Sequence, residues 1–376
     1  MGEGSIELSN RQYFTGLGWL RASWELLADG ETIRRGELDL PDVGPGERAQ
    51  LRLAGWTPPL PDGRVLSLIV RFRTAAELAW APQEFEVCWA QLPIASGIPE
   101  LSRPSARPLA ALPDGALVLD GDGLLVHEML AASPRLSLWR APTDNDRIAG
   151  LTAQWRDWGV AEIVRGAVSI QHEAGSIVVT AEERTAAGIV VGHVQTFRVV
   201  SGGGVLVEET VHIPEDLADL ARVGIVLEAL PGLEQVEWFG RGPVETYPDR
   251  RRAGAVARWR STVADMYVPY VRPQENGGRN SVRWLELSDG AGRGFRLAAD
   301  RPCQVSATHY RAADLATAMH DVELKPRPET IVHLDVAHRG LGTASCGPDT
   351  LPEYRVGPGT YKWSWLIAPL GARPTT

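Results

Sequence analysis

Short runs in which apolar and polar residues alternate recur along this sequence, and they constrain the fold more than any other feature. Residues 65–72 alternate with a period of two, which is the pattern of a strand with one buried face. Residues 189–200 and 205–213 are rich in β-branched side chains and are joined by three glycines, which predicts a hairpin. Apolar residues at helical spacing in 151–158 predict one short helix. The sequence therefore predicts an all-β fold with little helix.

Turn and breaker residues divide this series of strands into two β domains. Several short strands within residues 1–95, with a hairpin signal at Asp29-Gly30, predict an immunoglobulin-like β-sandwich. Residues 96–115 are rich in Pro, Ser, Ala and Gly and are expected to form an irregular linker. The strand pattern then resumes, so residues 116–376 predict one large sandwich.

Charge and cysteine content exclude several classes of partner. The formal net charge of −9 argues against nucleic acid or an anionic membrane as a ligand. Cys88, Cys303 and Cys346 are far apart and odd in number, which favours a reducing compartment over a disulfide framework or a zinc site. No apolar run approaches 18 residues and no signal region is found at the N-terminus. A cytoplasmic protein is therefore expected.

Residues 137–146, called here the Arg140 string, predict a strand that runs into a pinned loop. Pro142 ends regular pairing, and Asp144, Asn145 and Asp146 favour turns because their side chains bond nearby backbone. Arg140 stands four residues before Asp144, a spacing at which a bidentate ion pair can close across a turn. The residues favour turn chemistry over a metal or catalytic site.

Two further segments, residues 238–250 (the Glu245 string) and residues 265–279 (the Glu275 string), concentrate candidate chemistry. Glu245 and Asp249 are candidate paired carboxylates. The second segment combines aromatic, amide, acidic and basic side chains of the kind that grip a sugar: Tyr267, Tyr270, Glu275, Asn276 and Arg279. The favoured alternative is a buried polar network in which Glu245 and Glu275 pair with Arg241, Arg250 or Arg279.

Histidines offer one more candidate site. His320 and Glu323 are three residues apart, and His309 could join them in an epimerase-like arrangement. A lone strand histidine is more often a satisfied core or surface group than a base. No Ser-His-Asp order, phosphate loop or metal-ligand spacing is present.

Several strings also resemble a known family. Residues 10–14, 17–20 and 24–30 resemble the sandwich that follows the catalytic barrel in the large bacterial β-galactosidases of glycoside hydrolase family two. The Arg140, Glu245 and Glu275 strings, followed by residues 340–348 and 354–356, resemble signatures of the C-terminal small-chain domain of these enzymes, in the same order. This resemblance implies that the second domain is a large antiparallel supersandwich of the galactose-mutarotase-like type.

The same resemblance limits the activity that is expected. In that family the catalytic glutamates and the magnesium ligands belong to the barrel, and the resemblance begins at about residue 5. The expectation is therefore no catalytic residue, no metal site and no cofactor in this chain, with magnesium and sodium implied at the barrel. The chain is expected to be inactive alone and to complete and support the active site of a barrel-bearing partner in an oligomeric enzyme that hydrolyses terminal β-D-galactosides such as lactose.

The small-chain domain of the family lends the active site mainly one loop, here residues 340–354 (the 340–354 loop). In some relatives a Trp of this loop forms a wall of the galactoside pocket, whereas the nearest match here is Cys346, next to Gly347. Cys346 and Gly347 are therefore predicted to contact substrate in a roomier pocket. Two alternatives stay open, a free-standing carbohydrate-binding module and a mutarotase-like aldose epimerase.

Overall fold

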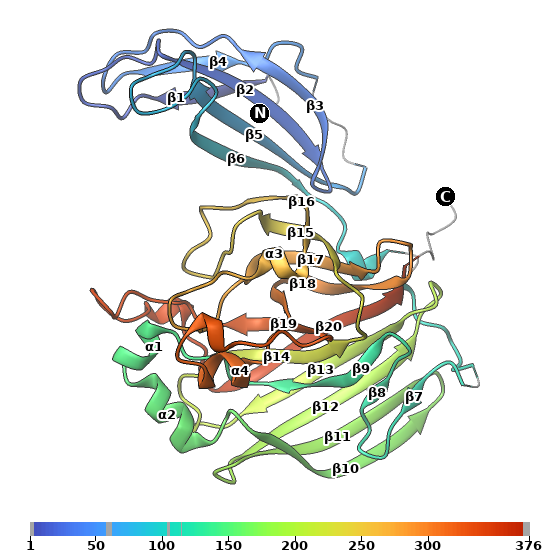
Figure 1. Cartoon of the computed structure of the whole chain (residues 1–376). Coiled ribbons are helices and arrows are strands. Elements are labelled where there is room, and N and C mark those ends of the chain that lie inside the picture. Colours follow the sequence, from blue (N-terminus) through green and yellow to red (C-terminus); the bar gives the residue numbers. More distant parts are fainter. Residues whose placement is uncertain (1–3, 58–61, 104–105, 114, 371–376) are drawn as a thin grey trace. The chain divides into compact units, whose positions relative to one another are not determined.

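The computed structural model describes residues 4–57, 62–103, 106–113 and 115–370. The chain divides into two compact units, one of Met1–Ile98 with Val256–Arg258 and one of Pro99–Ala255 with Trp259–Thr376 (Figure 1). Every strand pair described is antiparallel, so the all-β prediction is confirmed.

The first unit is a small sandwich of two sheets. One sheet has the order β3-β2-β5-β6 and the other pairs β1 with β4. The β2–β3 turn has positive φ at Asp29 (46°) and Gly30 (82°), which confirms the predicted Asp-Gly hairpin. The bounds of these strands are β1 Ser5–Ser9, β2 Leu20–Ala28, β3 Glu31–Leu38, β4 Arg48–Arg52, β5 Val65–Thr74 and β6 Glu86–Ser96.

The core of the first unit follows from the period-two pattern of its strands. In β5 the side chains of Leu66, Leu68, Val70 and Phe72 are buried on one face, as the alternation predicts. Trp24 and Leu26 of the paired strand β2 pack in the same cluster. Burial of these apolar faces between the two sheets stabilises the unit.

In the second unit, twelve strands of the described residues form one large antiparallel sheet that folds into two layers. The longer path has the order β10-β11-β12-β13-β20-β18-β17-β15-β16, and β9, β14 and β19 branch from it. The bounds are β9 Leu130–Ser137, β10 Ile163–Glu173, β11 Ser176–Thr185, β12 Val190–Val199, β13 Val205–Ile213, β14 Arg222–Ala229, β15 Gln235–Gly242, β16 Ala255–Thr262, β17 Arg279–Ser288, β18 Gly294–Thr308, β19 Thr330–His338 and β20 Gly359–Pro369.

Strand β18 connects the two layers. Its first half, from Phe295 to Ala299, pairs with β20, and its last residues, from Gln304 to Thr308, pair with β19. The faces of the two layers enclose a continuous core that includes Trp238, Trp363 and Trp365. A separate hairpin of β7 (Val118–Leu119) and β8 (Leu125–Val126) packs near β9.

The helices of the second unit are short. They are α1 (Asp144–Ile148), α2 (Leu151–Trp158), α3 (Val263–Met266) and α4 (Ala312–Thr317), with 3₁₀ turns at Glu100–Ser102, Asp321–Glu323 and Pro352–Tyr354. The predicted helix at 151–158 is confirmed as α2, which buries Leu151 and Trp155. The 3₁₀ turn at Glu100–Ser102 shows that the predicted linker is not wholly irregular; residues 104, 105 and 114 of that linker lie outside the described residues.

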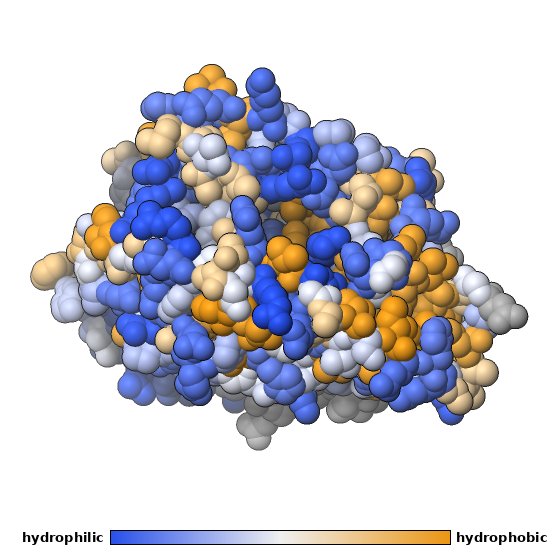
Figure 2. All heavy atoms as spheres, turned by 90° about the horizontal axis from the view of Figure 1, so that it is seen from below, coloured by the Kyte–Doolittle hydropathy of each residue, from blue (hydrophilic) through white to orange (hydrophobic). Residues whose placement is uncertain are grey.

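The surface is of mixed polarity. Figure 2 shows one face on which groups of hydrophobic side chains lie between hydrophilic ones. None of the helices in the described ranges is long and apolar enough to cross a lipid bilayer.

Candidate functional site

The three strings and the 340–354 loop, which are far apart in the sequence, meet in the second unit. Arg140 lies in the interior, where its side chain is fully buried. It donates two hydrogen bonds to the Asp146 carboxylate, at 3.1 and 2.8 Å, and two more to the carbonyl oxygens of Arg339 and Gly340, at 2.7 and 3.1 Å. One guanidinium therefore fixes both its own turn and the start of the 340–354 loop.

The predicted partner of Arg140 was wrong. Asp144, four residues away, pairs with Arg147 at 2.9 Å on the surface, and Asp146 takes the buried position. The reason is that the acidic cluster starts helix α1. Thr143 is the N-cap, and Thr143 and Asp146 form a reciprocal capping box that turns Asp146 inward. The expectation that the acidic cluster bonds nearby backbone is confirmed, because Asp146 takes part in the capping box of helix α1.

Asn145 and Asp249 hold the backbone of the loop from two sides. The Asn145 amide donates to the carbonyl oxygens of Leu341 and Gly342, at 3.0 and 2.8 Å, and its Oδ1 accepts from Ser345 N at 2.9 Å. The Asp249 carboxylate accepts from the N–H groups of Leu341 and Gly342, at 3.0 and 2.8 Å. Asp249 is thus a clamp for the loop, and the structure does not pair it with Glu245 as a catalytic carboxylate.

Arg339 ties the end of the loop to its beginning. Its buried guanidinium donates to Asp219 at 2.8 and 3.1 Å, to Asp349 at 2.9 and 3.1 Å, and to Thr350 Oγ1 at 2.7 Å. Burial alone would lower the pKa of Arg339, but hydrogen bonds and attraction from Asp219 and Asp349 raise it, so this side chain stays cationic.

Cys346 and Gly347 lie at the exposed tip of this loop. The Cys346 N–H donates to Thr343 O at 2.9 Å and so closes a tight turn. A Cβ atom at position 347 would lie 2.8 Å from Thr343 Oγ1, so glycine suits this turn. Their assignment as substrate-binding residues stays a prediction.

The two glutamates that the sequence offered as candidate carboxylates are both held by other groups. Glu245 accepts from Arg250, from the Tyr270 hydroxyl, and from Gly277 N at 2.9 Å. The expected pairing of Glu245 with Arg250 is therefore confirmed. Glu275 is buried and accepts from Arg222 Nη2 at 2.6 Å, a partner that the sequence did not indicate.

Buried charges surround Glu275. Burial alone would raise its pKa, but Arg222 and then His338 hold the pKa far below the ordinary value. Asp335 lies 3.6 Å from Arg222 Nη1, and burial raises the pKa of this carboxyl to about 7. Burial also lowers the pKa of His338 to about 4 and that of His333 well below its ordinary value. Glu275 is thus kept ionised, and it neutralises Arg222.

The remaining sugar-gripping candidates have structural contacts. Asn276 accepts from Val268 N at 3.0 Å, and Arg279 donates to Gly277 O at 2.8 Å and lies over the Trp238 ring. Arg241 donates to the carbonyls of Arg251 and Gly254 and contacts neither glutamate in the described structure. These residues shape the turns that carry Glu245 and Glu275.

The histidine candidates separate into two places. His320 contacts Glu323 at 2.7 Å on the surface, whereas His309 contacts Glu234 at 2.9 Å inside a pocket. No contact joins His309 to the His320–Glu323 pair among the described residues. Within those residues no group of three or more His, Cys, Asp or Glu side chains is arranged to hold a metal ion.

Sequence reasoning missed Arg222, Asp219, Asp335 and Arg339, whereas it expected His338 to be a satisfied core or surface group, and the structure buries it. Arg222 opens a strand, Arg-Val-Gly-Ile-Val-Leu-Glu-Ala, whose other positions are mostly buried and apolar. A permanent charge in a buried strand needs a buried partner of opposite charge. The position of Arg222 in an apolar strand could therefore have identified it as part of a buried ion pair.

The fold of this chain, two antiparallel β units with one polar loop held by buried charges, can now be compared with known protein families. The β-galactosidase small-chain profile matches residues 118–367, and the profile of β-galactosidase domain 4 matches residues 6–95. The chain belongs to the β-galactosidase small-chain family.

Individual relatives agree with this assignment. The β-galactosidase of Arthrobacter sp. (strain B7) is 28% identical over 393 residues, which cover 95% of this chain and 38% of that protein. The β-galactosidase of Lactobacillus delbrueckii subsp. bulgaricus is 26% identical over 371 residues, with 94% and 36% covered. The chain therefore spans little more than a third of the length of these relatives. A putative mutarotase of Salmonella typhimurium superposes with a TM-score of 0.33 at 10% identity, over 85% of this chain and 96% of that one, a likeness too small to support a conclusion.

Proposed function

We propose that this chain is a non-catalytic part of a β-galactosidase, which completes and supports the active site of a catalytic barrel. The barrel is carried by a partner chain or by another part of the same longer protein. The reaction of the full enzyme is the hydrolysis of terminal β-D-galactosides such as lactose. The observation that carries this proposal is that the Arg140 and Glu245 strings, which are far apart in the sequence, both bind the 340–354 loop.

The contacts of the loop support a role in presenting residues to a partner. A long exposed loop loses much backbone freedom when it is ordered, so such a loop is fixed only where several bonds hold it. Here Asn145 and Asp249 fix its first turn, and Arg339 joins its two ends. A preorganised loop adds binding groups to a site without a further ordering cost. We propose that Cys346 and Gly347 at its tip face the galactoside.

Exposed apolar side chains on the same segments support a docking face for the barrel. Val244 of the Glu245 string is 49% exposed, Val271 of the Glu275 string is 90% exposed, and Leu351 of the loop is 56% exposed. Exposed apolar side chains of this kind are typical of a protein–protein interface. Oligomerisation of the full enzyme is part of the proposal.

The engagement of Glu245 and Glu275 supports the proposal that this chain alone does not hydrolyse galactosides. Glycosidases need two carboxyl groups facing one bond, roughly 5–5.5 Å apart in retaining enzymes. Arg222 binds one of these glutamates, and Arg250 with Tyr270 binds the other. We assign magnesium and sodium to the barrel and not to this chain. The free thiols of Cys88, Cys303 and Cys346 are consistent with a cytoplasmic enzyme.

A complementation assay tests this function. The chain is assayed with a chromogenic β-galactoside alone, and after mixing with an Arthrobacter β-galactosidase from which the matched portion has been removed. We expect activity in the mixture and none from the chain alone. The excised portion of the relative serves as the positive control. Turnover by the chain alone that is lost in Glu245→Gln or Glu275→Gln would overturn the proposal, and so would a mixture that stays inactive while the positive control is active.

Cys346→Trp then tests the role of the loop tip. A Trp at this position fills space beside the substrate, so the KM of the complemented enzyme should change severalfold while complementation itself persists. Cys88→Trp, at an exposed cysteine of the first unit, is the matched control and should leave KM unchanged. Equal KM values in both variants would remove Cys346 from the substrate pocket.

A further inference from the structure

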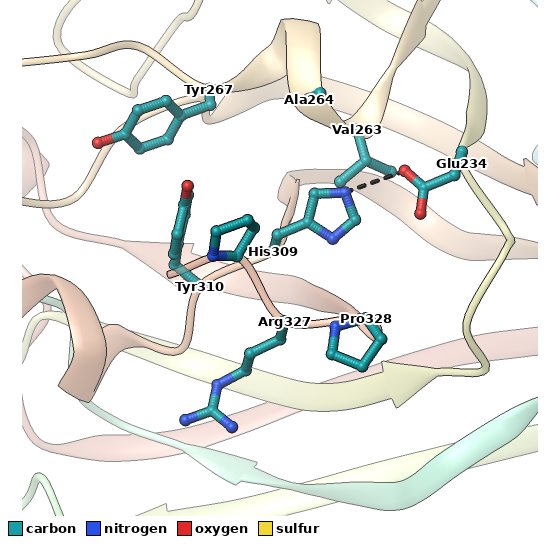
Figure 3. A pocket seen from close by; sticks show the side chains of 9 residues that line it. Glu234, Val263, Ala264, Tyr267, His309, Tyr310, Arg327 and Pro328 are labelled. Carbon is teal, nitrogen blue, oxygen red and sulfur yellow. Dashed lines mark hydrogen bonds and ion pairs between the residues drawn. The ribbon is translucent and has the colours of Figure 1, made fainter. Parts of the chain in front are cut away.

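A second pocket lies among the loops that join the two layers of the large sheet, and Figure 3 shows it from close by. It has a volume of about 510 Å³, within the range of roughly 300–1,000 Å³ typical of small-molecule sites. None of its lining residues belongs to the contacts that hold the 340–354 loop. The described lining residues are Glu234, Val263, Ala264, Tyr267, His309, Tyr310, Pro326, Arg327 and Pro328.

Two aromatic rings stand on one side of this pocket. The ring centroids of Tyr267 and Tyr310 are 5.1 Å apart, and the rings are inclined by 56°. The Tyr267 hydroxyl donates to Asp321 Oδ1 at 2.5 Å, which fixes the orientation of its ring. Val263, Pro326 and Pro328 add aliphatic surface. The walls therefore suit a ligand with a flat face of C–H groups.

A hydrogen-bonded pair stands opposite the rings, as Figure 3 shows. His309 Nε2 lies 2.9 Å from Glu234 Oε2, and Nδ1 lies 3.3 Å from Glu329 O, so each ring nitrogen faces an acceptor and the orientation of the imidazole is restricted. The Glu234 side chain is 39% exposed, and its second oxygen accepts no hydrogen bond from the described residues. This oxygen is a charged acceptor available to a hydroxyl donor.

The charges exclude two other kinds of ligand. Arg327, the one permanently cationic residue among those described as lining the pocket, is held by two hydrogen bonds to Asp314, at 2.7 and 2.9 Å. An anionic ligand would find no free cation here and would meet the carboxylate of Glu234. A wholly apolar ligand would bury that carboxylate without a partner, which is costly. A neutral ligand with several hydroxyl groups and one apolar face satisfies both walls.

We infer that this pocket binds a single neutral pyranose sugar, with one face of the ring against Tyr267 and Tyr310 and a hydroxyl donating to Glu234. This site is separate from the galactoside pocket proposed at the 340–354 loop and does not depend on that proposal. It gives the second unit a carbohydrate-binding function of its own.

Calorimetry and saturation-transfer NMR on the purified full chain test this site, with galactose and glucose as probes. A ligand of this size should bind with a Kd of about 1 mM. Tyr310→Ala and Glu234→Gln should each weaken binding by at least about tenfold, since one removes an aromatic contact and the other a charged acceptor. Tyr13→Ala and Glu128→Gln change exposed residues outside the pocket and should leave Kd unchanged. Circular dichroism and thermal unfolding establish that all four variants are folded.

The possible outcomes decide between the alternatives. Binding of either sugar that is lost in both pocket variants supports the site. The proposal is wrong if neither sugar shows saturation transfer at a concentration about 50 times the expected Kd of about 1 mM. It is also wrong if binding is unchanged in both pocket variants. Because no barrel is present, these results do not depend on complementation. A pocket variant that still complements while it loses sugar binding would separate the two functions directly.

Discussion

Two buried groups of charges in the second unit differ in how they are built. The first, called here the loop network, comprises Arg140, Asp146, Arg222, Glu275 and Asp335, and its members come from turns and strand ends that are far apart in the sequence. The second, called the strand cluster, comprises Arg165, Glu183, His193, Gln195 and Glu209 on the neighbouring strands β10 to β13. Both lie in the interior of the second unit.

The strand cluster is satisfied mainly by its immediate neighbours, and among the described residues Arg165 Nε is its one buried polar side-chain atom without a hydrogen-bond partner. His193 contacts Glu183 at 3.2 Å and Glu209 at 2.7 Å, one through each ring nitrogen. Gln195 stands opposite Glu209 in the register and donates to it at 3.2 Å, and Arg165 bonds both Glu183 and Gln195. Two cationic and two anionic groups balance. Such cross-strand pairs fix register and stabilise the sheet.

The loop network leaves more polar atoms without partners than the strand cluster does. Among the described residues, Arg222 Nε and Nη1 and Asp335 Oδ1 are buried and accept or donate no hydrogen bond. Each such atom costs stability. A fold tolerates this cost where the geometry serves something other than stability, and here Arg140 of the network also binds the Gly340 carbonyl of the 340–354 loop. The comparison teaches that the strand cluster, whose members lie on neighbouring strands, maintains the sheet, whereas the loop network, whose members come from distant segments, also holds a surface loop.

Removal of the central cation should have the largest effect. Arg222→Met leaves Glu275 buried without its main partner, and breaking a buried ion pair from one side costs about 3–5 kcal/mol. Urea unfolding followed by tryptophan fluorescence measures this change. Arg198→Met, at an exposed pair with Glu208, is the control and should cost less than about 1 kcal/mol. Equal losses in both variants would contradict the assigned role of Arg222.

The strand cluster should make stability depend on alkaline pH. Burial would lower the pKa of His193, but Glu209 and Glu183 raise it from 6.5 to about 9. The folded state therefore holds this proton more tightly than the unfolded state. The stabilisation is complete below pH 6.5 and is lost as the pH rises through 9, by an amount on the order of 3 kcal/mol. Unfolding free energies at pH 7 and pH 10 measure it, and His193→Gln should lack this component of the decrease.

Loss of the loop anchor should have a smaller, local effect. Asn145→Ala removes the bonds to Leu341, Gly342 and Ser345 and should cost about 1–2 kcal/mol. Hydrogen exchange should accelerate in residues 341–346 and stay unchanged in β13. Asn280→Ala, at a part-buried asparagine of β17, is the matched control. Unchanged exchange in the loop would mean that Asp249 and Arg339 suffice to hold it.

The smallest effect is expected at Asp335. Because burial raises its pKa to about 7, this carboxyl is largely protonated just below neutral pH, and one of its oxygens has no partner among the described residues. Asp335→Asn should therefore change the unfolding free energy by less than about 1 kcal/mol at pH 6.5. Asp146→Asn, which breaks the bidentate pair with Arg140, should cost several times more. A larger loss at position 335 than at position 146 would reverse the order proposed for the loop network.

Local pattern explains which parts of this molecule were predictable. The alternation in 65–72, the Asp29-Gly30 turn and the helix at 151–158 depend on neighbouring residues, and all three are confirmed. The ion pairs were less predictable because tertiary structure decides them. Glu275 lies 53 residues from Arg222, and Arg140 lies 199 residues from the Arg339 carbonyl that it binds. The sequence also could not show whether Asp144 or Asp146 pairs with Arg140, because the direction of helix α1 decides which carboxylate points inward.

The position of β20 has a consequence for synthesis. This strand, Gly359–Pro369, lies between β13 and β18 in the sheet, although it follows every other described strand in the chain. During synthesis β13 and β18 therefore emerge from the ribosome before β20, the strand that lies between them in the sheet. Until then each has an open edge, and an open edge invites pairing with other chains. The nascent protein must keep these two parts of the sheet apart and soluble until β20 emerges.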